Sequence, residues 1–163
     1  MKLFFAFALV LISLVGLAQE PSDSIKERQD IGTAFVERIP VAQGCNVIDP
    51  SDQAAMKLCM QQYIYSHIGS NFKYPKKARQ QAIQAKIIVQ FVIEKDASMS
   101  NVTIKKGAAD LYKDAKPKVL AAAQELDAEA IRVIELLKFE MPATQRSKPV
   151  RFTFTVPINA KLT

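Results

Sequence analysis

Lys86-Ile-Ile-Val-Gln-Phe-Val-Ile-Glu94 (KIIVQFVIE) is the stretch that decides the fold of this chain. Successive side chains of a strand point to opposite faces, so Ile87, Val89, Phe91 and Ile93 share one apolar face. Ile88, Gln90, Val92 and Glu94 share the other. A turn follows at 95–98, and Met99–Lys105 returns with Val102 and Ile104 inward. The stretch therefore predicts the first half of a β-hairpin.

Helical patterns surround this hairpin. One begins near Asp49-Pro50-Ser51-Asp52, where a capping residue and a proline suit a first turn, and is expected to stop at Gly69. Its apolar stripe follows three- and four-residue steps through Met56, Cys59, Tyr63, Ile64, His67 and Ile68. Shorter helices are predicted at Lys76–Ile83, after Tyr74-Pro75, and at Leu126–Leu137. Residues 107–124 predict only a turn and a short helix.

The last segment, Val150–Leu162, alternates again, with Val150, Phe152, Phe154 and Val156 on one side. Pro157 cannot donate to a β-ladder and therefore indicates an edge position or a strand end. Two helices, a hairpin, a helix and a final strand predict an α+β fold. We expect a two-layer sandwich, a small antiparallel sheet with helices on one face.

The N-terminus predicts secretion. Lys2, an apolar run over 3–14, and small residues at Gly16 and Ala18 make residues 1–18 a signal peptide, and 19–33 a polar, flexible lead-in. The alternative is an uncleaved inner-membrane anchor through residues 3–18, but that run is shorter than the ~20 residues that span a membrane. The expected location is the periplasm.

The chain carries a net charge of +6, spread along it without a dense basic block. An exported protein rarely meets nucleic acid, so this class of partner is not expected. The positive charge is better explained as a solvated basic face, or as a means of attracting anionic envelope lipids and acidic partner segments.

Cys45 and Cys59 are the only cysteines. In an oxidising compartment such a pair favours a disulfide, closing a loop of about 15 residues. The alternative is a zinc site, for which two thiols and the lone His67 supply too few ligands.

No arrangement of residues predicts catalysis, a metal or a cofactor. His67 is expected in the core or lining a groove, because the adjacent Ser66 would not face it on a helix. Glu125, Asp127 and Glu129 are explained by the helix dipole. We expect a protein that is not an enzyme and has no small-molecule substrate.

Four patterns in order resemble the TonB C-terminal domain family. They are Phe72-Lys-Tyr-Pro-Lys-Lys-Ala-Arg79 before the first strand, the hairpin over 92–102, Leu126-Asp-Ala-Glu-Ala130, and Pro142 through Pro149 with Phe152–Ile158. Upstream, Val36–Pro40, Gly44-Cys45 and Cys59 resemble the Bacteroidetes-type variant with a cysteine pair, which supports the disulfide. The implied domains are an extension over 34–71 and a TonB C-terminal-like domain over 72–163.

Glycines of the family pattern are replaced here by Ala85 and Ala97, which implies altered turns. In this family, a complete energy transducer has a membrane anchor that contains a histidine, followed by a long proline-rich arm. Here no histidine precedes His67 and no such arm follows the apolar run. The resemblance therefore implies the C-terminal module without these parts of a transducer.

The resemblance implies a non-catalytic periplasmic module, linked to TonB-dependent transport, that binds an extended, TonB-box-like segment of an outer-membrane transporter by strand addition. The implied partner-binding residues are Lys148, Pro149, Val150, Arg151, Phe152, Thr153, Phe154, Thr155 and Val156, with Phe72, Tyr74 and Pro75. Two alternatives stay open. In one, Phe152 and Phe154 belong to the core and their charged neighbours only protect the edge of the strand. In the other, the protein is a structural envelope domain that binds anionic lipid or cell-wall polymer through its basic surface. A homodimer through strand edges is also compatible with the pattern.

Overall fold

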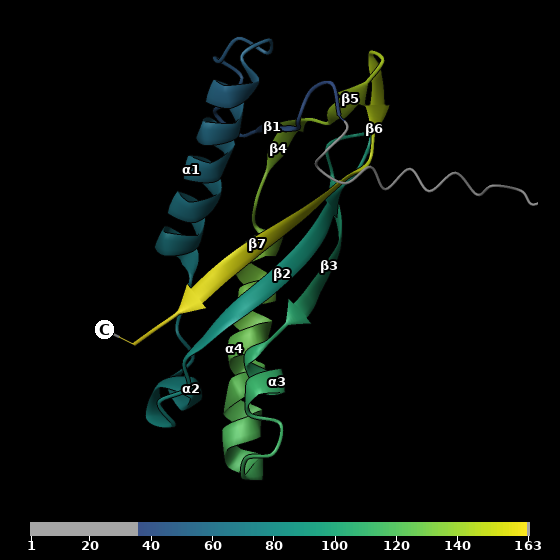
Figure 1. The fold of residues 1–163 in the computed structure, drawn as a ribbon. Coiled ribbons are helices and arrows are strands. Elements are labelled where there is room, and N and C mark those ends of the chain that lie inside the picture. The colour runs from purple at the N-terminus through teal and green to yellow at the C-terminus, as the bar shows by residue number, and fades with distance from the viewer. Residues whose placement is uncertain (1–35, 163) are drawn as a thin grey trace, which may run out of the picture.

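The computed structural model describes residues 36–162, so the predicted signal peptide and lead-in lie outside the described residues. A three-stranded antiparallel sheet forms the centre, in the order β3-β2-β7 (Figure 1). Its strands are β2 (Ala85–Ile93), β3 (Met99–Lys106) and β7 (Phe152–Ala160). The predicted hairpin is confirmed, and the last strand lies at an edge of the sheet, as Pro157 indicates.

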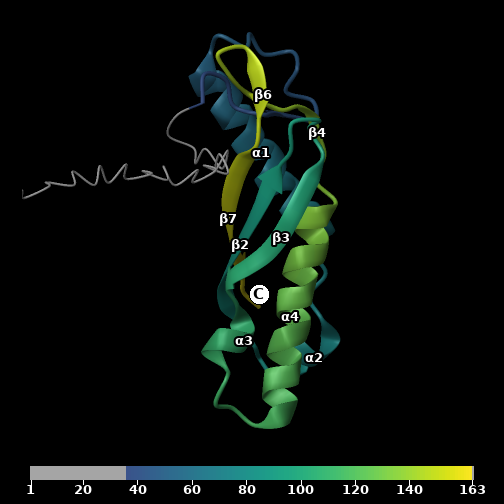
Figure 2. The ribbon, with the colours of Figure 1, turned by 90° about the vertical axis from the view of Figure 1, so that its right-hand side faces the viewer.

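One face of the sheet is buried and the other is largely polar. Ile87, Val89 and Phe91 are fully buried, and helix α4 (Pro117–Glu135) packs along their face (Figure 2). Lys86 and Thr155 are exposed on the opposite face. The predicted two-layer α+β architecture is therefore what the structure shows.

Helix α1 (Gln53–Asn71) lies on the β7 side of the molecule (Figure 1). The Asp52 side chain caps it by accepting from the Ala55 N–H at 2.9 Å. Its buried side chains recur every four residues, at Met56, Met60, Ile64 and Ile68. The predicted end at Gly69 is wrong, because the helix runs on to Asn71, whose amide Nδ2 donates to the His67 carbonyl.

A disulfide joins α1 to the loop before it. The Cys45 and Cys59 sulfurs are 2.07 Å apart, and Cys45 is buried. The expected disulfide is confirmed, and the zinc alternative is excluded for this pair.

The other helices differ in length from their predictions. Helix α2 is Lys76–Gln80, ending before Ala82, which has a positive φ of 50°. Residues 107–124 contain α3 (Ala108–Leu111) and the first part of α4. Helix α4 begins at Pro117, nine residues before Leu126, because proline suits a first helical turn.

A carboxylate from α4 connects these two helices. Asp127 accepts hydrogen bonds from the backbone N–H groups of Ala108 at 2.6 Å and Ala109 at 2.8 Å, at the start of α3. Burial of the side chain raises the pKa of Asp127, against the lowering effect of these two bonds. Because α4 begins at Pro117, Asp127 lies in the second half of the helix, and the helix-dipole explanation of this acid is wrong. Its carboxylate instead caps the start of α3.

Two small two-stranded sheets lie at the end of the molecule opposite α2 and α3 (Figure 1). One pairs β1 (Val41–Ala42) with β4 (Phe139–Met141), and the other pairs β5 (Ala143–Gln145) with β6 (Lys148–Val150). The single strand predicted over 150–162 is therefore wrong at its start. Arg146 and Ser147, with φ of 49° and 59°, turn the chain in a two-residue hairpin.

Candidate functional site

One edge of strand β7 is unpaired within the described part of the chain. Nine consecutive residue pairs join the strand to β2, from Ala85↔Ala160 to Ile93↔Phe152, with no break in register. Among the described residues, no strand pairs with its other edge and no loop makes a backbone hydrogen bond to it. The main chain of β7 can therefore accept one more strand.

The direction of the backbone groups follows from Pro157 and Gln90. A ladder tolerates proline where its nitrogen faces away from the neighbouring strand. The Gln90 carbonyl points toward β3, where it accepts from Thr103 Oγ1 at 3.5 Å. Gln90 and Thr155 are opposite one another in the β2–β7 ladder, and they form a pair without mutual backbone hydrogen bonds because Gln90 points away from β7. The N–H and C=O groups of Thr155 therefore point away from β2. By alternation, Thr153, Thr155 and Asn159 present their N–H and C=O groups at the free edge.

A groove with a volume of about 550 Å³ borders the C-terminal half of β7. Three elements supply its walls: α1, the segment from Phe72 to α2, and the strand itself. We call it the β7 groove, and its lining residues are Tyr65, Ile68, Gly69, Phe72, Tyr74, Arg79, Pro157, Ile158, Asn159 and Lys161. Because three consecutive β7 residues line it, with side chains on both faces, the groove reaches the free edge.

The groove combines apolar and basic surface. Tyr65 is 52% exposed, and the rings of Phe72 and Tyr74 meet edge to face, with centroids 6.2 Å apart. The exposed Arg79 and Lys161 add two positive charges. An extended peptide with apolar side chains and an acidic group fits this chemistry.

Hydrogen bonds to α4 fix the aromatic wall. Glu129 accepts from the Lys73 N–H at 2.6 Å, and Arg132 donates to Glu129 and to the Asn71 carbonyl. The hydrogen bond from Arg132 keeps the pKa of Glu129 below its usual value. The Tyr74 hydroxyl donates to the Ile83 carbonyl, and burial raises the pKa of Tyr74. These contacts hold Phe72 and Tyr74 in the groove lining, whereas Pro75, the next residue, is not part of it.

The predicted binding residues are divided between two places. Phe152 through Val156 lie in β7, with Phe152 and Val156 buried in the core. Lys148, Pro149 and Val150 lie in β6, outside the edge strand. Arg151, between the two strands, donates two hydrogen bonds to Glu94, each at 2.9 Å. The hydrogen bond from Ser100, and next to it those from Arg151, lower the pKa of Glu94.

The positive charge beside the groove comes from Arg79 and Lys161, not from Lys148 and Arg151, which the resemblance implied as binding residues. Arg79 closes the Phe72–Arg79 pattern, and Lys161 directly follows the last strand, so both carried a local signal. No local sequence signal indicated that α1 contributes to the groove, because Tyr65 and Gly69 lie near β7 only once the chain has folded.

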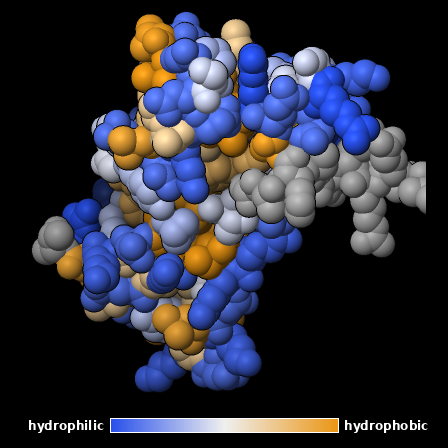
Figure 3. Space-filling view, turned by 45° about the horizontal axis from the view of Figure 1, so that its top comes forward, coloured by the Kyte–Doolittle hydropathy of each residue, from blue (hydrophilic) through white to orange (hydrophobic). Residues whose placement is uncertain are grey.

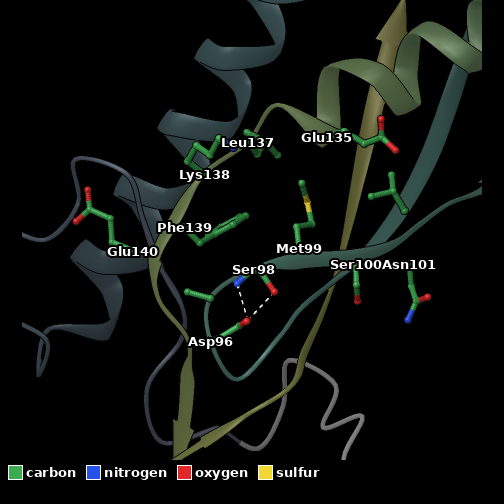
Figure 4. A pocket seen from close by; sticks show the side chains of 12 residues that line it. Asp96, Ser98, Met99, Ser100, Asn101, Glu135, Leu137, Lys138, Phe139 and Glu140 are labelled. Carbon is green, nitrogen blue, oxygen red and sulfur yellow. Dashed lines mark hydrogen bonds between the residues drawn. The ribbon is translucent and has the colours of Figure 1, made fainter.

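The opposite edge of the sheet, at β3, is less suited to a visiting strand. The register between β2 and β3 shifts twice, and Asn101 has a positive φ of 51°. Such bulges protect edge strands from pairing. A hollow of about 620 Å³ lies beside this edge, where Met99 and Phe139 approach one another between Glu135 and Glu140 (Figure 4).

The described residues contain no group of three side chains that could hold a metal ion. His67 is half-buried on α1, and its ring centroid lies 6.0 Å from that of Tyr63.

Within the described part of the chain, no helix is both long and apolar enough to cross a membrane. On the face shown in Figure 3, hydrophobic side chains form separate patches among hydrophilic ones.

Residues 70–162 match the family model described as the C-terminal part of the Gram-negative bacterial TonB protein. The chain belongs to the TonB C-terminal family. This assigns the TonB-like domain to a group of envelope protein-interaction modules. Most of α1, including Tyr65 and Gly69, precedes the matched residues.

A solved structure, the C-terminal domain of Helicobacter pylori TonB, is similar at 21% identity with a TM-score of 0.41. The similarity covers 63% of this chain and 80% of that domain. No curated protein matches the sequence.

Proposed function

We propose that this TonB-like protein acts in the periplasm as a non-catalytic module that binds an extended segment of an outer-membrane transporter by strand addition to β7. The free, regular edge of β7 is the observation that carries this proposal. Main-chain hydrogen bonds supply the affinity, and the β7 groove selects the side chains of the visiting segment.

Several features support this edge over β3. The register of β7 is unbroken over nine pairs, whereas β3 is bulged. Aromatic side chains and two basic residues line the groove beside β7, whereas the hollow beside β3 is lined by three acids, Asp96, Glu135 and Glu140, and one cation, Lys138. A TonB-box-like peptide with apolar and acidic residues is therefore complementary to the β7 side.

Gly69 offers a way to close the groove without disturbing the fold. A Cβ added at Gly69 meets no atom within 4 Å, so Gly69→Trp places an indole in open groove space. We expect the Kd of residues 19–163 for an eight-residue TonB-box-like peptide to rise at least about tenfold, because the ring occupies the path of the peptide. Fluorescence anisotropy of a labelled peptide measures it.

Gly69→Ala is the matched control, since a methyl group leaves the groove open; its Kd should stay within about twofold. Peptides N-methylated at alternate residues separate strand addition from side-chain docking, because only one of the two sets directs its N–H groups at β7. Equal affinity of Gly69→Trp and Gly69→Ala, or equal loss with both methylated sets, argues against the proposal.

A further inference from the structure

Positive charge is concentrated at one end of the molecule. Residues 73–86, 105–129 and 161 carry eleven Lys or Arg against five Asp or Glu. The remaining described residues carry eight against seven. These segments form α2, α3, the start of α4 and the adjoining strand ends, which lie together at the lower end of Figure 1. We call this end the basic pole.

An apolar side chain stands at the centre of the basic pole. Leu111, at the end of α3, is 64% exposed. Two shallow hollows of about 360 and 290 Å³ meet at Leu111, one reaching Lys86 and Lys106 and the other Lys86 and Lys161. A leucine surrounded by lysines is therefore presented to solvent.

These lysines are not neutralised within the described part of the chain. The ion pairs found there involve Lys77, Arg132 and Arg151, not the three lysines around Leu111. The nearby carboxylates serve the backbone: Asp110 accepts from the Gly107 N–H at 2.7 Å, and Asp127 caps α3. The field of the lysines is thus available to an external anion.

We propose that the basic pole docks on an anionic phospholipid surface, with Leu111 entering the interface and Lys86, Lys106 and Lys161 contacting lipid phosphates. Lysine stems lie along apolar surface while their ammonium groups stay at the headgroups. The exposed leucine favours a lipid over a soluble anionic polymer, because only the lipid offers an apolar layer to receive it. With one inserted side chain, the attachment is reversible.

Docking at this pole places the peptide site at the membrane surface. Lys161 lines both a Leu111 hollow and the β7 groove, so the two sites adjoin. A module held there would meet a transporter segment close to where it leaves the membrane. Apart from Lys161, the lipid contact uses residues outside the β7 groove and outside the free edge of β7, so it stands without the proposed function.

The test is co-sedimentation of residues 19–163 with vesicles of phosphatidylglycerol and phosphatidylcholine in equal parts. The double variant Lys86→Glu/Lys106→Glu should lower the partition coefficient at least about tenfold. Leu111→Ser should lower it about fivefold, through the lost apolar contact. Binding should weaken at 0.5 M salt and be absent on phosphatidylcholine alone.

Lys57→Glu/Lys138→Glu changes the net charge equally at exposed positions outside the pole, and its partition coefficient should stay within about twofold of the parent. Equal losses in the two double variants would overturn the localisation. No effect of Leu111→Ser, together with full competition by soluble polyglutamate, would overturn the lipid as partner. Peptide affinity measured on the same variants should not change, which separates this proposal from strand addition.

Discussion

Gly107→Ala is expected to lower the free energy of unfolding by about 3 kcal/mol. An added Cβ would lie 2.4 Å from Oδ2 and 2.8 Å from Cγ of Asp127. The carboxylate cannot yield, because the N–H groups of Ala108 and Ala109 hold it. Chemical denaturation followed by circular dichroism measures the loss.

The same substitution at Gly69 is the control. It lies in α1 with open space around it, so Gly69→Ala should stabilise the protein by up to about 1 kcal/mol, since alanine favours helix. In an Asp127→Ala background, Gly107→Ala should cost less than about 1 kcal/mol, because its obstacle is gone. A full loss in that background would show that the contact with Asp127 is not the cause.

Removing the disulfide is expected to have the second large effect. Cys45→Ala/Cys59→Ala should lower the free energy of unfolding by about 3 kcal/mol, the entropy of a closed loop of about 15 residues. The cysteines are 14 positions apart. The bond ties α1 to the preceding loop, so peptide affinity should fall as well, because one wall of the β7 groove is less firmly held.

Reduction provides the control for this experiment. Dithiothreitol should destabilise the parent protein by a similar amount and leave the double variant unchanged. A parent whose unfolding midpoint does not respond to dithiothreitol under denaturing conditions would contradict the expectation.

Alternating side chains predicted the central sheet well. The pattern over 86–94 needs only Ala85 added and Glu94 removed to become β2. The pattern failed where local chemistry was unusual. Arg146 and Ser147 adopt positive φ without a glycine, so the turn before β6 carried no signal, and the alanine-rich start of α4 lacked a clear apolar stripe.

The candidate site was predictable only where it follows one strand. Phe152–Val156 lie in β7, and Phe72 and Tyr74 line the groove, but the wall from α1 depends on helix packing. Tyr65 and Gly69 are separated from Asn159 by about ninety residues of chain. No local pattern records such a contact.

The most direct test of strand addition is amide hydrogen exchange of β7 by NMR, with and without saturating TonB-box-like peptide. Strand addition predicts slower exchange at Thr153, Thr155 and Asn159, whose N–H groups face the free edge. Phe154 and Val156, already bonded to β2, should change little. Unchanged exchange at all three outward amides with bound peptide, or new protection along β3 instead, would contradict the account.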